Sequence, residues 1–143
     1  MITPAAIPLS LYVHLPWCTQ KCPYCDFNSH EGFTPDLQGP YVTALLQDFD
    51  SQLQGIEGRL VESIFIGGGT PSLFSGEWIQ RLLSGLAERM PFAPGAEITL
   101  ESNPGSAERG RYQSYLEAGV TRLSIGVQSF NDGALGRLGR IHS

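Results

Sequence analysis

The chain has 143 residues, enough for one domain with a hydrophobic core. Hydrophobic residues make up 41% of it, so intrinsic disorder is not expected. The formal net charge of −5 and the lack of a basic run argue against nucleic acid or an anionic membrane as the main partner. No apolar stretch reaches transmembrane length, and residues 1–10 carry no secretory pattern, so we expect a cytoplasmic protein.

The first third of the chain predicts a strand, a loop and a helix. Residues 11–15 are a mostly apolar run, typical of a strand buried on both faces in a parallel sheet. Glycines and prolines gather in residues 28–40, which predicts a loop. Apolar residues then recur at helical spacing from Val42 to Leu53, which predicts a helix with one apolar face.

The rest of the chain repeats this alternation. Three further strands are predicted, each followed by a helix, at residues 63–66, 97–101 and 122–128. The residues expected to cap the helices at their N-termini are Ser75, Ser106, and Asn131 or Asp132. Gly119 is the expected stop of the third helix.

Alternating strands and helices predict an α/β fold with a parallel sheet and right-handed crossovers. The unusual polar features all follow strands: a cysteine loop, a triple-glycine turn at 67–69, Glu101 and Gln128. In barrels of this class, the carboxyl ends of the strands carry the active site. We therefore expect these features to meet at one edge of the sheet.

All three cysteines, Cys18, Cys22 and Cys25, lie on one loop with the spacing C-x3-C-x2-C. A [4Fe–4S] cube takes one protein ligand per iron, so three thiolates would leave one iron open for a small molecule. A disulfide would strand the third thiol and needs an oxidising compartment. Zinc is the stronger alternative, with His14 or His30 as the fourth ligand, although structural zinc sites usually use two separated pairs.

The pattern C-x3-C-x-aromatic-C, with Tyr24 as the aromatic, resembles the signature of radical S-adenosylmethionine (SAM) proteins. The longer stretch 11–30 resembles the HemW-type heme chaperones, close relatives of the oxygen-independent coproporphyrinogen III oxidases. The resemblance covers essentially the whole chain. It implies a partial radical SAM (β/α)6 TIM-like barrel, with about four of its βα units present. Because family members are considerably longer, we interpret residues 1–143 as the N-terminal part of the core barrel, without the remaining strands and a C-terminal domain.

The same resemblance implies the site residues. The three cysteines would bind the cluster, the methionine amine and carboxylate of SAM would chelate the open iron, and an electron from the cluster would yield a 5′-deoxyadenosyl radical. The residues matching SAM contacts are Tyr12, Tyr24, Gly68, Gly69, Thr70, Glu101, Gln128 and Arg140. The glycine turn alone is weak evidence, since glycines after a strand are often only a turn. The three histidines remain unassigned.

One departure from the oxidases bears on function. They carry a fourth cysteine two residues after the third, where this chain has Phe27. We therefore expect a heme chaperone-like role in heme trafficking and insertion into client hemoproteins, with a flavodoxin- or ferredoxin-type electron donor implied by the resemblance. The expected heme-binding motif would lie downstream of residue 143.

Two alternatives stay open. The first is an oxygen-independent coproporphyrinogen III oxidase of porphyrin biosynthesis, in which case the protein is an oxidoreductase. The second is a zinc or electron-transfer module without SAM chemistry. Whether the protein is an enzyme stays open too, because the fold implied by the resemblance is able in principle to cleave SAM reductively.

Overall fold

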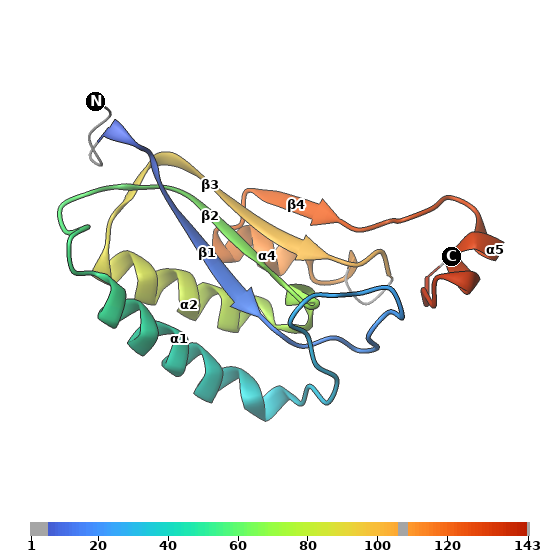
Figure 1. The fold of residues 1–143 in the computed structure, drawn as a ribbon. Coiled ribbons are helices and arrows are strands. Elements are labelled where there is room, and N and C mark those ends of the chain that lie inside the picture. Colours follow the sequence, from blue (N-terminus) through green and yellow to red (C-terminus); the bar gives the residue numbers. More distant parts are fainter. Residues whose placement is uncertain (1–5, 106–108, 143) are drawn as a thin grey trace.

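The computed structural model describes residues 6–105 and 109–142. Its described residues form a four-stranded parallel sheet in the order β1-β2-β3-β4 (Figure 1). The strands are β1 (Leu9–Leu15), β2 (Val61–Gly68), β3 (Phe92–Ser102) and β4 (Arg122–Ile125). The predicted α/β fold with a parallel sheet is confirmed.

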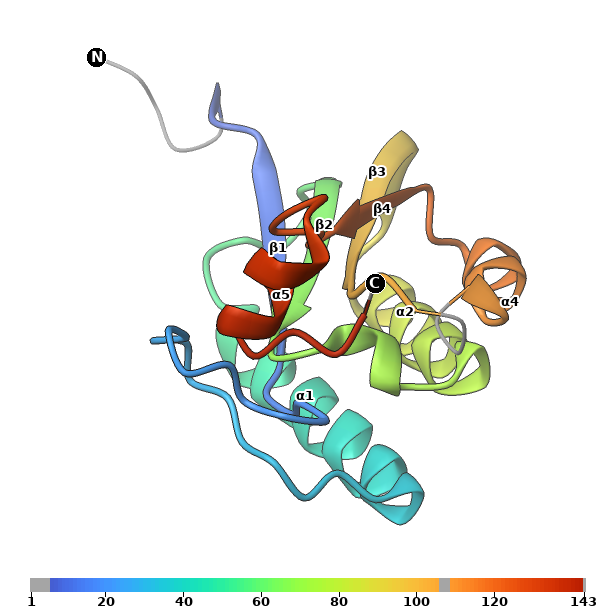
Figure 2. The ribbon, with the colours of Figure 1, turned by 90° about the vertical axis from the view of Figure 1, so that its right-hand side faces the viewer.

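The helices lie between the strands in sequence and largely on one side of the sheet in space. They are α1 (Gln38–Gln52), α2 (Gly76–Arg89), α4 (Tyr112–Ala118) and α5 (Asp132–Arg137), with short 3-10 helices η2 (Pro35–Leu37) and η3 (Pro71–Leu73). Figures 1 and 2 show α1, α2 and α4 against one face of the sheet, whereas α5 lies beyond the carboxyl ends of the strands.

The hydrophobic core fills the space between the sheet and these helices. Its central strand residues are Val13, Leu15, Ile64, Ile66, Ile98 and Leu100, and its helix residues include Val42, Phe49, Ile79, Leu82, Leu83 and Leu86. The opposite face of β1 is open, since Tyr12 is 62% exposed. The prediction that β1 is buried on both faces is therefore wrong, because the described helices cover only one of them.

Several element boundaries differ from the prediction. Helix α1 begins at Gln38, inside the predicted loop, and accommodates Pro40 because a first helical turn needs no backbone donor there. Strand β4 ends at Ile125 rather than at residue 128. The strand ends early because the chain turns, and Gln128 has a left-handed backbone with φ of 67°.

The helix caps agree with the sequence where the structure describes them. The hydroxyl of Ser75 accepts from the backbone of Trp78 at the start of α2. The Asn131 side chain accepts from Ala134 at 2.8 Å and caps α5. Gly119 ends α4 with φ of 106°, a conformation that glycine adopts without steric cost. The predicted cap Ser106 lies outside the described residues.

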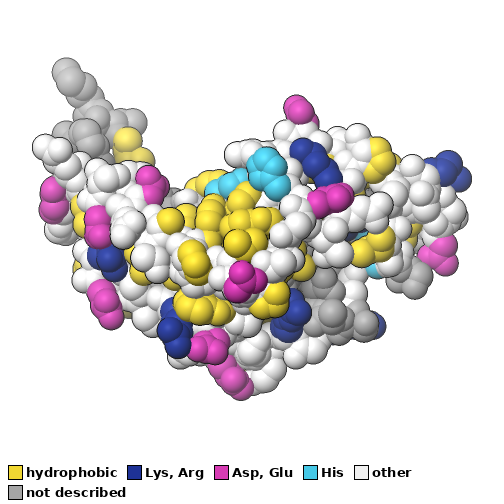
Figure 3. Space-filling model, turned by 90° about the horizontal axis from the view of Figure 1, so that it is seen from below, with side chains coloured by type: hydrophobic (Ala, Val, Ile, Leu, Met, Phe, Trp, Pro, Cys, Tyr) yellow, Lys and Arg dark blue, Asp and Glu magenta, His cyan; other side chains and the backbone are white. Residues whose placement is uncertain are grey.

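Two surface features of the described part bear on its partners. None of its helices is long and apolar enough to cross a bilayer. Figure 3 shows acidic and basic side chains interspersed on the face seen from below. That face therefore offers no uniformly basic surface of the kind that binds nucleic acid.

Candidate functional site

The cysteine loop leaves the carboxyl end of β1 and closes on itself at its base. Trp17 pairs in parallel with His30. The backbone N–H of Cys18 donates to the His30 carbonyl at 2.8 Å, and the N–H of His30 donates to the Pro16 carbonyl at 2.7 Å. These bonds join the two arms of the loop and fix the position of the first cysteine.

Aromatic side chains pack against the base of the cysteine loop. The Trp17 ring meets Tyr41 edge-on, with centroids 4.7 Å apart, and also contacts Phe33 and Phe74. The Tyr41 hydroxyl donates to the carbonyl of His14 at 2.8 Å. Edge-on aromatic pairs stabilise beyond the area they bury, so the start of the loop rests on a rigid platform.

The glycine turn packs directly against the first cysteine. A Cβ atom added at Gly69 would lie 2.6 Å from the Trp17 carbonyl oxygen and 2.9 Å from the Cys18 sulfur. The N–H of Gly69 donates to the Leu15 carbonyl at 2.9 Å, and that of Thr70 to the Trp17 carbonyl at 2.7 Å. Only glycine at residue 69 permits this approach of two backbones.

Glu101 reaches this turn from the end of β3. Its Oε2 accepts from the N–H of Gly68 at 3.3 Å, and a Cβ at Gly67 would lie 3.0 Å from the same oxygen. The two strands run parallel, with Ile66 opposite Leu100, so the turn and the carboxylate meet at the same edge of the sheet.

One cavity of about 160 Å³ brings together the predicted site residues except Tyr12. Its lining includes Cys18, Cys22, Cys25, Tyr24, Gly68, Gly69, Thr70, Glu101, Gln128 and Arg140, together with Phe27 and Asn103. Tyr12 lies on the open face of β1, where its ring stacks on Phe65. Burial, and secondarily the Glu101 charge, raise the pKa of Tyr12 above its ordinary 10.0, so its hydroxyl stays protonated at neutral pH.

Arg140 extends toward the cysteine loop from the segment after α5. Its Nη2 donates to the Gly126 carbonyl at 2.7 Å and to Oδ1 of Asn103 at 2.9 Å. Its Nη1 lies 3.6 Å from the Cys22 sulfur, and its Nε is buried without a partner. A guanidinium in this position attracts an anionic ligand group.

Tyr24, from the cysteine loop, stands beside the same two groups. Burial is the largest cause that raises the pKa of Tyr24, and a hydrogen bond with Cys22 adds to it. The nearby Arg140 guanidinium acts in the opposite direction and lowers that pKa. The pKa of Tyr24 is thus raised overall, although Cys22 and Arg140 act on it in opposite directions.

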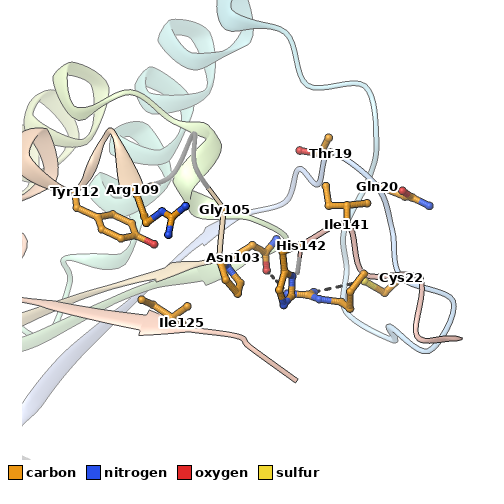
Figure 4. A pocket seen from close by; sticks show the side chains of 13 residues that line it. Thr19, Gln20, Cys22, Asn103, Gly105, Arg109, Tyr112, Ile125, Ile141 and His142 are labelled. Atoms are coloured by element: carbon orange, nitrogen blue, oxygen red, sulfur yellow. Dashed lines mark hydrogen bonds between the residues drawn. The ribbon is translucent and has the colours of Figure 1, made fainter. Parts of the chain in front are cut away.

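A larger cavity of about 640 Å³ adjoins this site and shares Gln20, Cys22, Asn103 and Arg140 with it. Figure 4 shows its lining, with Cys22 at one end and Tyr112 and Arg109 at the other. It contains only one of the three cysteines. The chemistry expected from the sequence is therefore concentrated in the smaller cavity.

The donor set of the cysteine loop is three thiols that line one cavity. All three are free, yet among residues 6–105 and 109–142 no three His, Cys, Asp or Glu side chains form a group suited to one metal ion. A cube attaches each thiolate to a different iron, so its ligands stand farther apart than those of one ion.

The histidines of the zinc alternative are engaged elsewhere. His14 contacts the Tyr12 hydroxyl at 2.9 Å through Nδ1 and the Asn28 carbonyl at 2.8 Å through Nε2. His30 Nε2 contacts the Asn28 side chain at 3.0 Å. These contacts involve both ring nitrogens of His14 but only one ring nitrogen of His30.

Sequence reasoning missed Asn103, whose Nδ2 donates to the Thr70 hydroxyl at 3.2 Å while its Oδ1 accepts from Arg140. The sequence did hold one signal for Asn103. It follows Glu101 by two residues at the end of β3, and residues two apart in a strand point to the same face of the sheet.

The chain is similar to proteins whose functions have been described. Residues 12–143 match the model of the "Radical SAM superfamily". The chain is 58% identical over 137 residues to the heme chaperone HemW of Escherichia coli, covering 94% of this chain and 36% of that protein. It is 53% identical over 144 residues to the HemW of Haemophilus influenzae, covering 98% and 38%. The chain thus spans little more than a third of the length of these relatives.

A solved structure gives the same result for the fold. Coproporphyrinogen III oxidase (HemN) from Escherichia coli, described as a radical SAM enzyme, superimposes with a TM-score of 0.85 at 34% identity. The match covers 95% of this chain and 31% of the oxidase chain. From the family match and these identities, the chain belongs to the radical SAM superfamily and is a homologue of the HemW heme chaperones.

Proposed function

We propose that this chain binds a [4Fe–4S] cluster through Cys18, Cys22 and Cys25, and SAM beside it, as part of a heme chaperone. The observation that best supports this is the single cavity in which the three thiols face the glycine turn, Glu101 and Arg140. We also propose that residues 1–143 form the N-terminal part of a radical SAM core barrel, since the HemW relatives are longer.

The proposed SAM residues divide by charge. The Glu101 carboxylate beside the N–H of Gly68 suits a positively charged amine, and Gly68 and Gly69 line the same cavity. Arg140, beside Cys22, suits a carboxylate. Thr70, Gln128 and Tyr24 complete the cavity wall, and Tyr12 lies next to it. The cluster, when bound, would supply the electron that cleaves the carbon–sulfur bond of SAM.

The heme-related role rests on similarity and on one residue. The two HemW relatives are described as heme chaperones, at 58% and 53% identity. Phe27 lines the cavity edge and is 66% exposed, and its side chain offers no thiol. Heme or a porphyrin, a client hemoprotein and a flavodoxin- or ferredoxin-type donor are the proposed partners, in the cytoplasm, where thiols stay reduced.

A coproporphyrinogen III oxidase is the second candidate. The observation that favours it is the superposition on the oxidase from Escherichia coli, with a TM-score of 0.85. In that case the protein would be an oxidoreductase that decarboxylates its substrate with SAM. The chemistry at residue 27 then distinguishes the two candidates, because phenylalanine can neither donate a proton nor bind a metal.

The test uses the longest polypeptide that carries this sequence, reconstituted without oxygen. We expect about four irons per chain, following one protein or ligand donor per iron of the cube. Heme binding is measured by spectroscopic titration. Oxidase activity is measured separately, by supplying coproporphyrinogen III with SAM and a reductant and assaying protoporphyrinogen IX. A stable heme complex without decarboxylated product supports the chaperone. Turnover to protoporphyrinogen without heme binding would reverse the assignment.

A further inference from the structure

Asn103 connects two parts of the candidate site that are distant in sequence. Its side chain bonds to Thr70 in the glycine turn and to Arg140 near the end of the described chain. Arginine has only donors, so the amide oxygen must face Arg140, which leaves the amide nitrogen to donate to the Thr70 hydroxyl. The orientation of the amide is thus fixed by its partners.

Arg140 has few other fixed partners. It lies beyond α5 in a segment without regular structure. Apart from Asn103, its guanidinium donates to the Gly126 carbonyl, contacts the Cys22 sulfur and interacts with Tyr24, and its Nε has no partner. A long side chain on an irregular segment loses conformational entropy when it is held in one orientation, so each bond that holds it matters.

We propose that Asn103 is a positioning residue: its amide holds the Arg140 guanidinium between the glycine turn and Cys22, in the orientation that receives the carboxylate of SAM. The inference rests on the proposed SAM site. Asn103 acts through Arg140, while its amide nitrogen donates to the Thr70 hydroxyl.

The experiment measures SAM affinity by equilibrium dialysis with labelled SAM, in the reconstituted longest polypeptide that carries these residues. Asn103→Ala removes one bond to a charged group and should raise the dissociation constant about tenfold, with iron content unchanged. The EPR change that SAM causes in the reduced cluster should need correspondingly more SAM. Gln113→Ala, on the exposed surface of α4, is the matched control and should leave the affinity unchanged.

A second pair of variants tests the route of the effect. In an Arg140→Ala background, Asn103→Ala should cause no further loss, because the residue through which it acts is gone. Asn103→Gln keeps a neutral amide that can accept from Arg140 and should recover part of the affinity, which also decides the matter if Asn103→Ala loses its iron.

Three outcomes would overturn the inference: wild-type affinity in Asn103→Ala, an equal loss with and without Arg140, or an iron-replete Asn103→Gln that binds SAM as weakly as Arg140→Ala. Failure of the wild-type protein itself to bind SAM would instead refute the proposed function, and the inference with it. The two failures are therefore distinguishable.

Discussion

Replacing Gly69 with alanine should force the glycine turn away from the cysteine loop. The added Cβ would lie 2.6 Å from the Trp17 carbonyl oxygen and 2.9 Å from the Cys18 sulfur. The first of these is a backbone atom that already accepts from Thr70 at 2.7 Å. The Trp17 ring is also packed against Tyr41, so the loop cannot shift without losing that contact.

The expected cost combines two effects. Overpacking a tight site costs about 1–3 kcal/mol, and losing the Thr70–Trp17 hydrogen bond adds about 1 kcal/mol. The free energy of unfolding should therefore fall by roughly 2–4 kcal/mol, less than the 5–15 kcal/mol typical of a folded domain. Gly136→Ala is the matched control: no atom lies within 4 Å of its added Cβ. Inside α5 it should stabilise by about 0.5–1 kcal/mol.

The assay has two readouts. Denaturant unfolding of the metal-free proteins gives the free energy, and iron analysis after anaerobic reconstitution reports whether the thiols still assemble a cluster. We expect Gly69→Ala to be destabilised and to bind less iron, and Gly136→Ala to bind iron as the wild type does. A Gly69→Ala protein with wild-type stability and full iron content would show that the close packing of turn and loop is unimportant.

Three other predictions concern single side chains. Cys25→Ala should prevent assembly of the four-iron cluster and remove its visible absorbance, and stoichiometric zinc in the wild-type protein purified without oxygen would contradict the cluster. Tyr115→Phe should lower the free energy of unfolding by about 1–3 kcal/mol, because the buried hydroxyl donates to two backbone carbonyls at 2.8 Å; an unchanged melting curve would refute this. Burial, then the charges of neighbouring groups, raise the pKa of Tyr41 above 10.0, so its contribution to stability is full below pH 10.0 and is lost as pH rises through the higher folded value. In Tyr41→Phe the free energy of unfolding should fall less than in the wild type as the pH rises above 10.0. Equal falls in both proteins would contradict the assignment.

The order of elements was predictable because each has a local signal. The helical spacing from Val42 to Leu53 identified α1, and the runs before the cysteines and the glycines identified β1 and β2. The one-sided burial of β1 was not predictable from its composition. An apolar run has the same pattern whether helices cover one face of the sheet or both, and only the arrangement of the helices decides.

The site was predictable where residues form a pattern and not where a single residue acts across long distances in sequence. The cysteines have a diagnostic spacing, and the glycine turn follows a strand. Asn103 has no such pattern, since its partners lie 33 and 37 residues away. The left-handed backbone of Gln128 could not be predicted for a different reason: residues other than glycine seldom adopt this conformation.

Phe27 shows how one loop can serve two kinds of chemistry. The loop around it is held by the Lys21 side chain, whose Nζ donates to the Phe27 carbonyl at 3.1 Å and to that of Ser29 at 3.4 Å. The side chain at residue 27 takes no part in these bonds and is 66% exposed, so its identity can change without rebuilding the loop. A cysteine there would add a thiol at the edge of the cavity, whereas phenylalanine adds an apolar face on which a flat ligand can stack. Under the proposed function, Phe27 therefore suits a site that holds a flat macrocycle, and it offers no thiol for the chemistry of the oxidase candidate.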